Sequence, residues 1–472
     1  MKQKLTFATV FWVLIAMNTG IFAQESSSSS FTLKEAQEYA AKNSYSVRNT
    51  AIDLVIAKKK IWETTAMGLP QINGQIQYQD MLDIPTTLLP DFISPSIYGV
   101  LMMEGVKDRF GNPITMPAST GATFPAKFGT QHNASLGGTL SQLIFSGQYI
   151  VGLQASKVFY QMSVEGQQKS QIDARFSVST SYYLVLVLKQ NKEILEKSLT
   201  TLQKTVFEAE QSNKQGFIED ITVDQMRINL ITLENAITSI EGQVETALNL
   251  LKFQMGIDIS QPLVLTDNLE SFINEALLQP SNGAALDVNR MIDYQIMQTQ
   301  LKLQKLNLRR EKFNFLPTIA GFYTYQQKAM RQEFDIFDKG KDWFPTSIIG
   351  INIDIPIFSS GSRLMKVQQA KLNVQKMEIA ELQVSEGLKL EAAQASTSFN
   401  TAFQKFNKEK TSKDLASKVY QTTLTKYNSG VATSIELTQS YSQYLTSESN
   451  YHMALMEMLT AKLKLDKSTG KL

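Results

Sequence analysis

The sequence predicts a mostly α-helical chain with a few strands, built from two copies of one unit: a helix, two strands and a long helical hairpin. Two tracts, 126–261 and 357–472, contain no proline, so they can hold very long helices. The segment "IFSG" at 144–147 returns as "IFSSG" at 357–361, and each is preceded by a strand-like apolar run. The same spacing separates each of these motifs from a later glycine in a polar cluster. These observations together indicate a tandem duplication.

The N-terminus predicts export. Residues 1–23 have two early lysines, an apolar run from Leu5 to Met17 and a small residue, Ala23, at the expected cleavage point, which is the pattern of a signal peptide. An uncleaved membrane anchor is the alternative, but the run is shorter than the roughly 20 residues of a spanning helix. Residues 24–30, rich in serine, are expected to be a flexible leader. If the mature protein crosses a membrane, it must do so with strands.

The first structural repeat is expected over 31–262. Thr32 and Glu35 form a capping-box pattern that starts a helix, and Pro70 ends the helical segment. Residues 71–80 alternate apolar and polar side chains, which predicts a strand, and a second strand is expected at 132–145. The proline-rich stretch 81–128 between them is predicted to be a long loop that faces the cell exterior.

The second repeat, 286–472, follows a predicted linker at 263–285 and repeats the same order. A helix ends at Leu316-Pro317, and strands are expected at 318–327 and 346–357. The first repeat is longer because only it contains the proline-rich loop.

The change from strand to helix occurs at Ser146-Gly147 in the first repeat and at Ser360-Gly361 in the second. Glycine tolerates backbone conformations that other residues avoid. Each switch is therefore predicted to use a permissive backbone at the point where a strand turns into a helix.

The helical hairpins are predicted from Gly216 and Gly430, which lie 69 residues after Gly147 and Gly361, respectively. A glycine that ends a polar cluster is suited to the left-handed conformation that terminates a helix, so both are predicted to be hairpin tips. Apolar residues on both sides of the first tip step by four and three, the heptad pattern of helices packed nearly parallel. They are Leu195, Leu199, Leu202, Val206, Ala209, Met226, Leu230, Leu233, Ile237, Ile240, Val244, Ala247 and Leu251.

An exported chain that alternates strands with long helices can place the strands in a membrane and the helices outside it. Four strands cannot close a barrel, and an open sheet edge in lipid leaves backbone groups unsatisfied. Three copies supply twelve strands, enough for a closed barrel.

Composition excludes several functions. The charge is balanced, with 46 Lys and Arg against 44 Asp and Glu, so no basic surface for nucleic acid is predicted. The chain has no cysteine and only two histidines, and it contains no phosphate-binding loop or nucleophile motif. We therefore expect no enzyme activity, no metal and no cofactor.

The motifs together resemble the TolC-like outer-membrane efflux proteins over nearly the whole mature chain. The resemblance is carried by Leu69-Pro70, Leu316-Pro317, the two switches and the two tip glycines, in order and with equal hairpin spacing. It implies a homotrimeric duct, with a 12-stranded β-barrel in outer-membrane lipid that continues into a long periplasmic α-helical barrel. It further implies a passive conduit that receives substrates from an inner-membrane transporter through a periplasmic adaptor, which contacts the hairpin tips.

The resemblance also implies a constriction at the tips. At the second tip Tyr427 and Gly430 match the family pattern, Ala432 replaces an arginine, and Glu436 and Gln439 take two acidic positions. At the first tip the site residues are Thr222, which replaces an aspartate, and its neighbours Asp220 and Asp224. Ala432, Glu436 and Gln439 are expected to share one helix face, with Glu436 forming a ring of three carboxylates in the trimer. The alternative is that Glu436 is a solvated helix residue.

Two other classes of protein fit parts of the pattern. A periplasmic adaptor also carries a long helical hairpin, but it normally has one hairpin inserted in a small domain. An elongated coiled-coil scaffold protein explains the helices without explaining the strand pairs.

Overall fold

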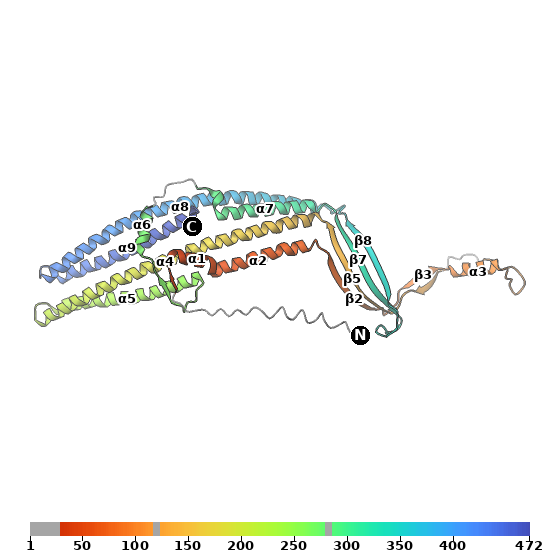
Figure 1. The fold of residues 1–472 in the computed structure, drawn as a ribbon, viewed down its shortest axis with the longest axis horizontal. Coiled ribbons are helices and arrows are strands. Elements are labelled where there is room, and N and C mark those ends of the chain that lie inside the picture. Colours follow the sequence, from red (N-terminus) through yellow and green to blue (C-terminus); the bar gives the residue numbers. More distant parts are fainter. Residues whose placement is uncertain (1–28, 117–122, 279–285) are drawn as a thin grey trace, which may run out of the picture. The chain divides into compact units, whose positions relative to one another are not determined.

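The computed structural model describes residues 29–116, 123–278 and 286–472. The predicted signal peptide and residues 24–28 of the predicted leader lie outside this part of the chain. The described chain is mostly helical, as predicted, and runs twice through the expected order of elements (Figure 1). Within the described ranges, no helix is both long and apolar enough to cross a membrane.

The elements of the first repeat are β1 (Ser29–Phe31), α1 (Leu33–Asn43), α2 (Tyr45–Ala66), β2 (Gln71–Asp80), β3 (Thr86–Pro90), α3 (Ile93–Met103), β4 (Thr123–Lys127), β5 (His132–Phe145), α4 (Gly147–Lys214) and α5 (Asp220–Met255). Between the repeats lie β6 (Leu263–Leu265) and α6 (Leu269–Leu278). The elements of the second repeat are the 3-10 helix η1 (Val288–Arg290), α7 (Ile292–Phe313), β7 (Thr318–Arg331), β8 (Phe344–Asp354), α8 (Ser362–Asn428) and α9 (Ser434–Ser468).

The described chain divides into two compact units. One contains the residues up to Ile56 together with Gln161–Gln300 and Glu378–Leu472, and it holds both helical hairpins. The other contains Ala57–Tyr160 and Leu301–Met377, and it holds the main sheet. The sheet and the hairpin tips therefore belong to different units.

The main sheet is antiparallel, with strand order β2-β5-β7-β8. Strands β2 and β5 have the predicted bounds, whereas β7 continues to Arg331, beyond the predicted end at 327. Strand β8 ends at Asp354, before the predicted 357, because Pro356 has no N–H to donate and restricts the residue before it. Strands β2 and β8 are the edges of this sheet.

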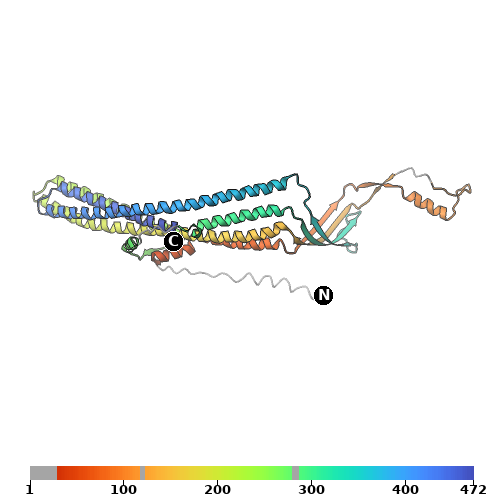
Figure 2. The same ribbon diagram turned by 90° about the horizontal axis from the view of Figure 1, so that it is seen from above.

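The compact unit that holds both helical hairpins, which we call the hairpin unit, is held together by apolar side chains at heptad spacing, as predicted. Leu202, Val206, Met226 and Leu233 are buried in one cluster near the tips. A second, larger cluster includes the ends of α5 and α9 and parts of α4 and α8. The hairpins α4–α5 and α8–α9 lie side by side in both views (Figures 1 and 2).

The predicted leader and linker are both wrong in part. Ser29 and Ser30 belong to β1, which pairs in parallel with β6, and residues 263–285 begin with β6 and α6 rather than with an irregular linker. The hydroxyl of Tyr182 donates to the Phe31 carbonyl at 2.9 Å and to Asp267 at 3.1 Å, while Asp267 accepts from the Leu33 N–H at 2.6 Å. Strands of three residues carry almost no local signal, because distant partners stabilise them.

The predicted loop 81–128 also contains regular structure. Strands β3 and β4 form a two-stranded antiparallel ribbon, and α3 follows β3. We call residues 81–128 the insertion. Its proline content is compatible with these elements because Pro95 lies in the first turn of α3, where no helical N–H is needed.

The two strand-to-helix switches differ in mechanism. Ser360 and Gly361 have φ of 48° and 80°, so the second switch uses the left-handed backbone that was predicted. Gly147 does not have a positive φ, and α4 begins directly at this residue. A Cβ at Gly147 would meet the Cβ of Phe313 at 3.0 Å, so here glycine permits close packing against the end of α7. The backbone explanation predicted for the first switch is therefore wrong.

Candidate functional site: the helical tips

Both predicted tips are present in the hairpin unit. Gly216 and Gly430 have φ of 81° and 74°, the left-handed conformation expected at a helix C-terminus. The N–H of Phe217 donates to the Ser212 carbonyl at 2.9 Å, and the N–H of Val431 donates to Lys426 in the same way at 2.9 Å. The two tips therefore close with matching hydrogen-bond patterns.

The second tip leads into α9 through a capping box. Thr433 accepts from the Glu436 N–H at 3.2 Å, and the Glu436 carboxylate accepts from the Thr433 N–H at 2.7 Å. These hydrogen bonds from Thr433 hold the pKa of Glu436 below its ordinary value. Glu436 is exposed and ionised, and it already has a structural role within one copy.

Not all of the predicted pore residues share a helix face. Ala432 precedes the first residue of α9, so only Glu436 and Gln439 step along that helix. The expectation that Ala432 lies on the same helix face is wrong, because the turn continues through residues 431–433 after Gly430 before α9 begins. Gln439 is exposed, while Ala432 lines a cleft between the two tips.

This cleft, which we call the tip cleft, lies between the hairpins. The hydroxyls of Thr222 on α5 and Ser434 on α9 lie 3.5 Å apart, and Asn229 donates to the Thr438 hydroxyl at 3.2 Å. Tyr427 lines the cleft, and its partial burial raises the pKa of its hydroxyl. The cleft residues are Thr205, Glu208, Ala209, Ser212, Phe217, Ile218, Thr222, Tyr427, Asn428, Gly430, Ala432, Thr433 and Ser434.

The two aspartates of the first tip have partners within their own hairpin. Asp220 accepts from the Asn213 side chain at 2.9 Å. Asp224 lies 3.6 Å from Arg227, which pairs more closely with Glu210 at 2.7 Å. At the tips, neutral contacts therefore join the two hairpins, while Asp220 and Asp224 interact within the first hairpin.

A row of aromatic and ionisable side chains above the tips was not predicted. Tyr420 stacks on Tyr444 with ring centroids 5.5 Å apart, and Tyr441 lies 5.2 Å from Tyr420. Further along α9, Glu448 and His452 are buried. The sequence does contain a heptad pattern here, but it was not recognised because several of its positions are polar or ionisable. Its members are Leu437, Tyr441, Tyr444, Glu448, Tyr451, Leu455 and Met458.

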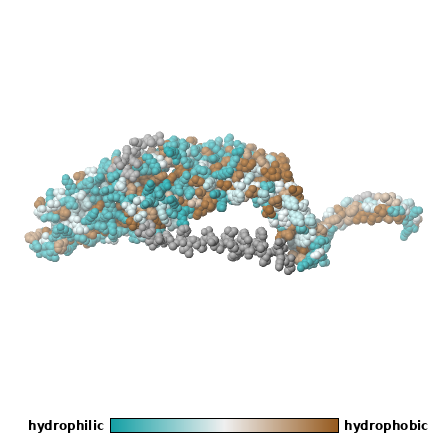
Figure 3. All heavy atoms as spheres, viewed as in Figure 1, coloured by the Kyte–Doolittle hydropathy of each residue, from teal (hydrophilic) through white to brown (hydrophobic). Residues whose placement is uncertain are grey.

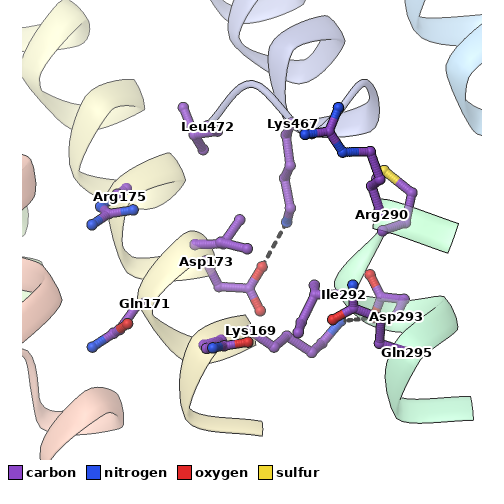
Figure 4. Close-up of a pocket in the computed structure, with 14 residues that line it drawn as sticks. Lys169, Gln171, Asp173, Arg175, Arg290, Ile292, Asp293, Gln295, Lys467 and Leu472 are labelled. Carbon is purple, nitrogen blue, oxygen red and sulfur yellow. Dashed lines mark hydrogen bonds and ion pairs between the residues drawn. The ribbon is translucent and has the colours of Figure 1, made fainter. Parts of the chain in front are cut away.

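A second pocket in this unit is a charged junction between the repeats (Figure 4). Lys467, at the end of α9, donates to Asp173 on α4 at 2.7 Å, and Lys169 on α4 forms an ion pair with Asp293 on α7. Lys467 also lies over the ring of Phe176, 4.9 Å from its centroid. These pairs connect the second repeat to the first. In the described part of the chain, no group of three or more acidic or histidine side chains is placed to hold a metal.

Comparison with known proteins relates the second repeat to a described family. Residues 293–471 match the model of the family described as Outer membrane efflux protein. A comparison with curated protein sequences finds no match. The first-repeat half is therefore related to the family through its fold.

Solved structures with the same fold cover 93% of the chain. They include CusC (16% identity, TM-score 0.68, 91% of that chain), VceC from Vibrio cholerae (15%, 0.65, 96%) and the CmeC outer membrane channel of Campylobacter jejuni (16%, 0.66, 85%). The second repeat therefore matches the outer membrane efflux protein family, and the chain as a whole has the fold of the outer-membrane channels named above, in agreement with the resemblance found in the sequence.

Proposed function

We propose that three copies of this outer-membrane efflux protein form one duct, with the main sheets closing into a 12-stranded barrel and the hairpins forming a periplasmic α-helical barrel. The observation that carries the proposal is a four-stranded antiparallel sheet whose two edge strands, β2 and β8, have no further strand partner among the described residues of one copy. In lipid such edges must pair, and identical copies can pair them in a closed ring. The protein itself acts as a passive conduit.

The sheet has the two faces that a barrel wall needs. Ile72, Leu140, Tyr323 and Ile349 form one row across the four strands, and Ile72 and Ile349 are 79% and 84% exposed. The adjacent row, Asn73, Thr139, Thr324 and Ile348, is mostly polar and contains a hydrogen bond of 3.0 Å between the two threonines. One face suits lipid and the other suits a water-filled lumen.

Helix α8 supports side-by-side assembly because it has two opposite apolar faces. One face is buried within the chain and includes Ala370, Val374, Leu388, Phe399 and Phe406. The other face, which we call the α8 stripe, recurs at whole helical turns and is exposed: Met365, Leu372, Ile379, Leu390, Leu415 and Val419. A helix that is apolar on both sides is normally buried on both sides, so the α8 stripe requires a partner chain.

Helix α2 offers a second unpartnered surface, with Ile52, Val55, Ile56 and Trp62 exposed. In a ring, each copy meets its neighbours through two different surfaces. We assign the α8 stripe and this α2 surface to these contacts. The tips then lie at the periplasmic end, where the tip cleft is available to an adaptor that connects the duct to an inner-membrane transporter.

The proposed orientation predicts the result of proteolysis. Lys107 and Arg109 are exposed in the turn after α3, so trypsin added to intact cells should cleave the chain there. Lys214 and Lys426, exposed at the tips, should be cleaved only after the outer membrane is permeabilised. Immunoblotting distinguishes the fragments produced by cleavage after α3 from those produced by cleavage at the tips. Cleavage at the tips of intact cells would reverse the orientation.

The gate proposal is that Glu436 forms a ring of three carboxylates at the narrow end of the duct. In planar bilayers the wild type should conduct and prefer cations, and Glu436→Gln should lose several-fold of that preference and of its block by multivalent cations. Glutamine also fits the third position of a capping box, so the helix start is preserved. Glu35→Gln is the matched control, because Glu35 forms the same box with Thr32 at the start of α1.

The bilayer experiment separates two outcomes. Absence of any conductance by the purified wild-type trimer would refute the duct itself. Normal conductance with the same cation preference in the wild type and in Glu436→Gln would refute the ring and leave the duct.

A further inference from the structure

The insertion contains a helix with no buried side chain. None of the residues of α3 is charged, and none is buried. Ile97 is 53% exposed and Val100 is 60% exposed. Figure 3 shows the insertion as largely hydrophobic along β3 and α3. An apolar helix in water is unfavourable unless another surface covers it.

The helix is well formed at both ends, so its exposure does not come from irregular backbone. Asp91 accepts from the Ser94 N–H at 2.9 Å and caps the first turn. Gly105 has a φ of 67°, and the Val106 N–H donates to the Leu101 carbonyl at 3.0 Å, closing the last turn. The apolar side chains are therefore presented on a defined surface.

Three of the exposed residues follow the spacing of a coiled-coil seam. Ile93, Ile97 and Val100 step by four and three residues along one face of α3. Isoleucine at both core positions of a heptad favours three or four strands over two. This pattern fits a bundle of three such helices.

The chain connections join the base of the insertion to an edge of the sheet. Strand β3 begins six residues after β2, which is an edge strand, and β4 ends shortly before β5. The Met81 N–H donates to the Gln131 carbonyl at 2.8 Å, which extends the β2–β5 ladder to the base of the insertion. The insertion is thus continuous with the edge that the proposed trimer pairs.

We propose that the α3 helices of three copies pack together through Ile93, Ile97 and Val100 and form a small apolar bundle at the insertion end of the duct. The inference rests on the proposed trimer, which tethers the helices at high effective concentration. A membrane surface fits less well, because an interfacial helix has a strongly polar face and α3 has none. The helix is also too short to span a bilayer.

The test uses the absence of cysteine in the chain. Ile97→Cys places the thiol on the proposed seam. Tyr98→Cys is the matched control, because residue 98 is the next residue along α3 and its side chain projects from a different side of the helix. On oxidation of outer membranes, Ile97→Cys should form disulfide-linked dimers about tenfold faster than Tyr98→Cys, since the seam holds the thiols together. Non-reducing gels followed over time measure the rates.

Further measurements identify any other occupant. Native mass in detergent first establishes whether each variant is a trimer. A trimer with equal or no cross-linking at the two positions overturns the bundle but leaves the proposed duct, whereas a monomer overturns both. Bimane on Ile97→Cys that is quenched by brominated phospholipids, or a disulfide to a different protein, also overturns the bundle.

Discussion

Ile379→Glu should prevent assembly of the trimer. Ile379 is 67% exposed within one copy and lies within the α8 stripe, between Leu372 and Leu390. If the stripe packs against a neighbour, a carboxylate there is buried without a partner, which costs roughly 3–5 kcal/mol at each interface. The penalty occurs three times in the ring, so the trimer should dissociate into monomers.

The measurement is native mass in detergent together with efflux by cells that carry the variant. Asn373→Glu is the matched control, because Asn373 is exposed on the same helix about a quarter turn from Leu372. This control should remain trimeric, and Ile379→Leu should do the same. A stable, active Ile379→Glu trimer would show that the α8 stripe is not the contact surface.

His452 should make the hairpin unit less stable in acid. It is 3% exposed, and among the described residues neither ring nitrogen has a hydrogen-bond partner. Its Nε2 lies 3.7 Å from Glu448, while Lys413 and the ring of Tyr451 also face it. Burial first, and then the charge of Lys413, lowers the pKa of His452 to about 4.

The sign of the effect follows from the two states. The unfolded chain takes up the histidine proton near pH 6.5, whereas the folded chain takes it up only near pH 4. Stability is therefore fully present above about pH 6.5 and falls as the pH decreases toward 4, by roughly 3 kcal/mol per copy. Burial raises the pKa of Glu448, which acts in the opposite direction and reduces the net loss.

Comparison with His452→Leu isolates this contribution. The midpoint of thermal unfolding, followed by circular dichroism in detergent, should fall between pH 7 and pH 5 in the wild type and fall less in the variant. At pH 7 the variant should be at least as stable, since leucine introduces no buried unpaired polar atom. Equal pH dependence in the two proteins would mean that His452 is not the group responsible.

Features with a local cause were predicted well from the sequence. The alternation in 71–80 and the prolines before β2 and β7 determine where two strands begin, and Gly216 and Gly430 stop helices through their own backbone freedom. The heptads of α4 and α5 are formed by apolar residues and were recognisable. In α9 the corresponding seam contains tyrosines and Glu448, with His452 buried beside it, so this polar cluster was missed.

Features with a distant cause were not predictable in this way. The two short strands β1 and β6 exist because they pair with a partner far away in the chain, and Gly147 is required by Phe313 rather than by its own φ. The candidate gate illustrates a further limit. Glu436 and its spacing were recognised, but its hydrogen bonds to Thr433 emerge only from the backbone at the start of α9.

The pairing of β1 with β6 has a consequence for the time course of folding. The Leu33 N–H and the Asp267 carboxylate that accepts it are 234 residues apart in the chain. A contact between residues so far apart in the chain forms late, because the residues between them must first be exported and then closed into a loop. During export the amino-terminal segment emerges first and yet acquires its partner only when residues 263–267 arrive, after the whole first repeat. Until then the first repeat lacks this contact at its amino-terminal end, so its maturation waits on the segment that follows it.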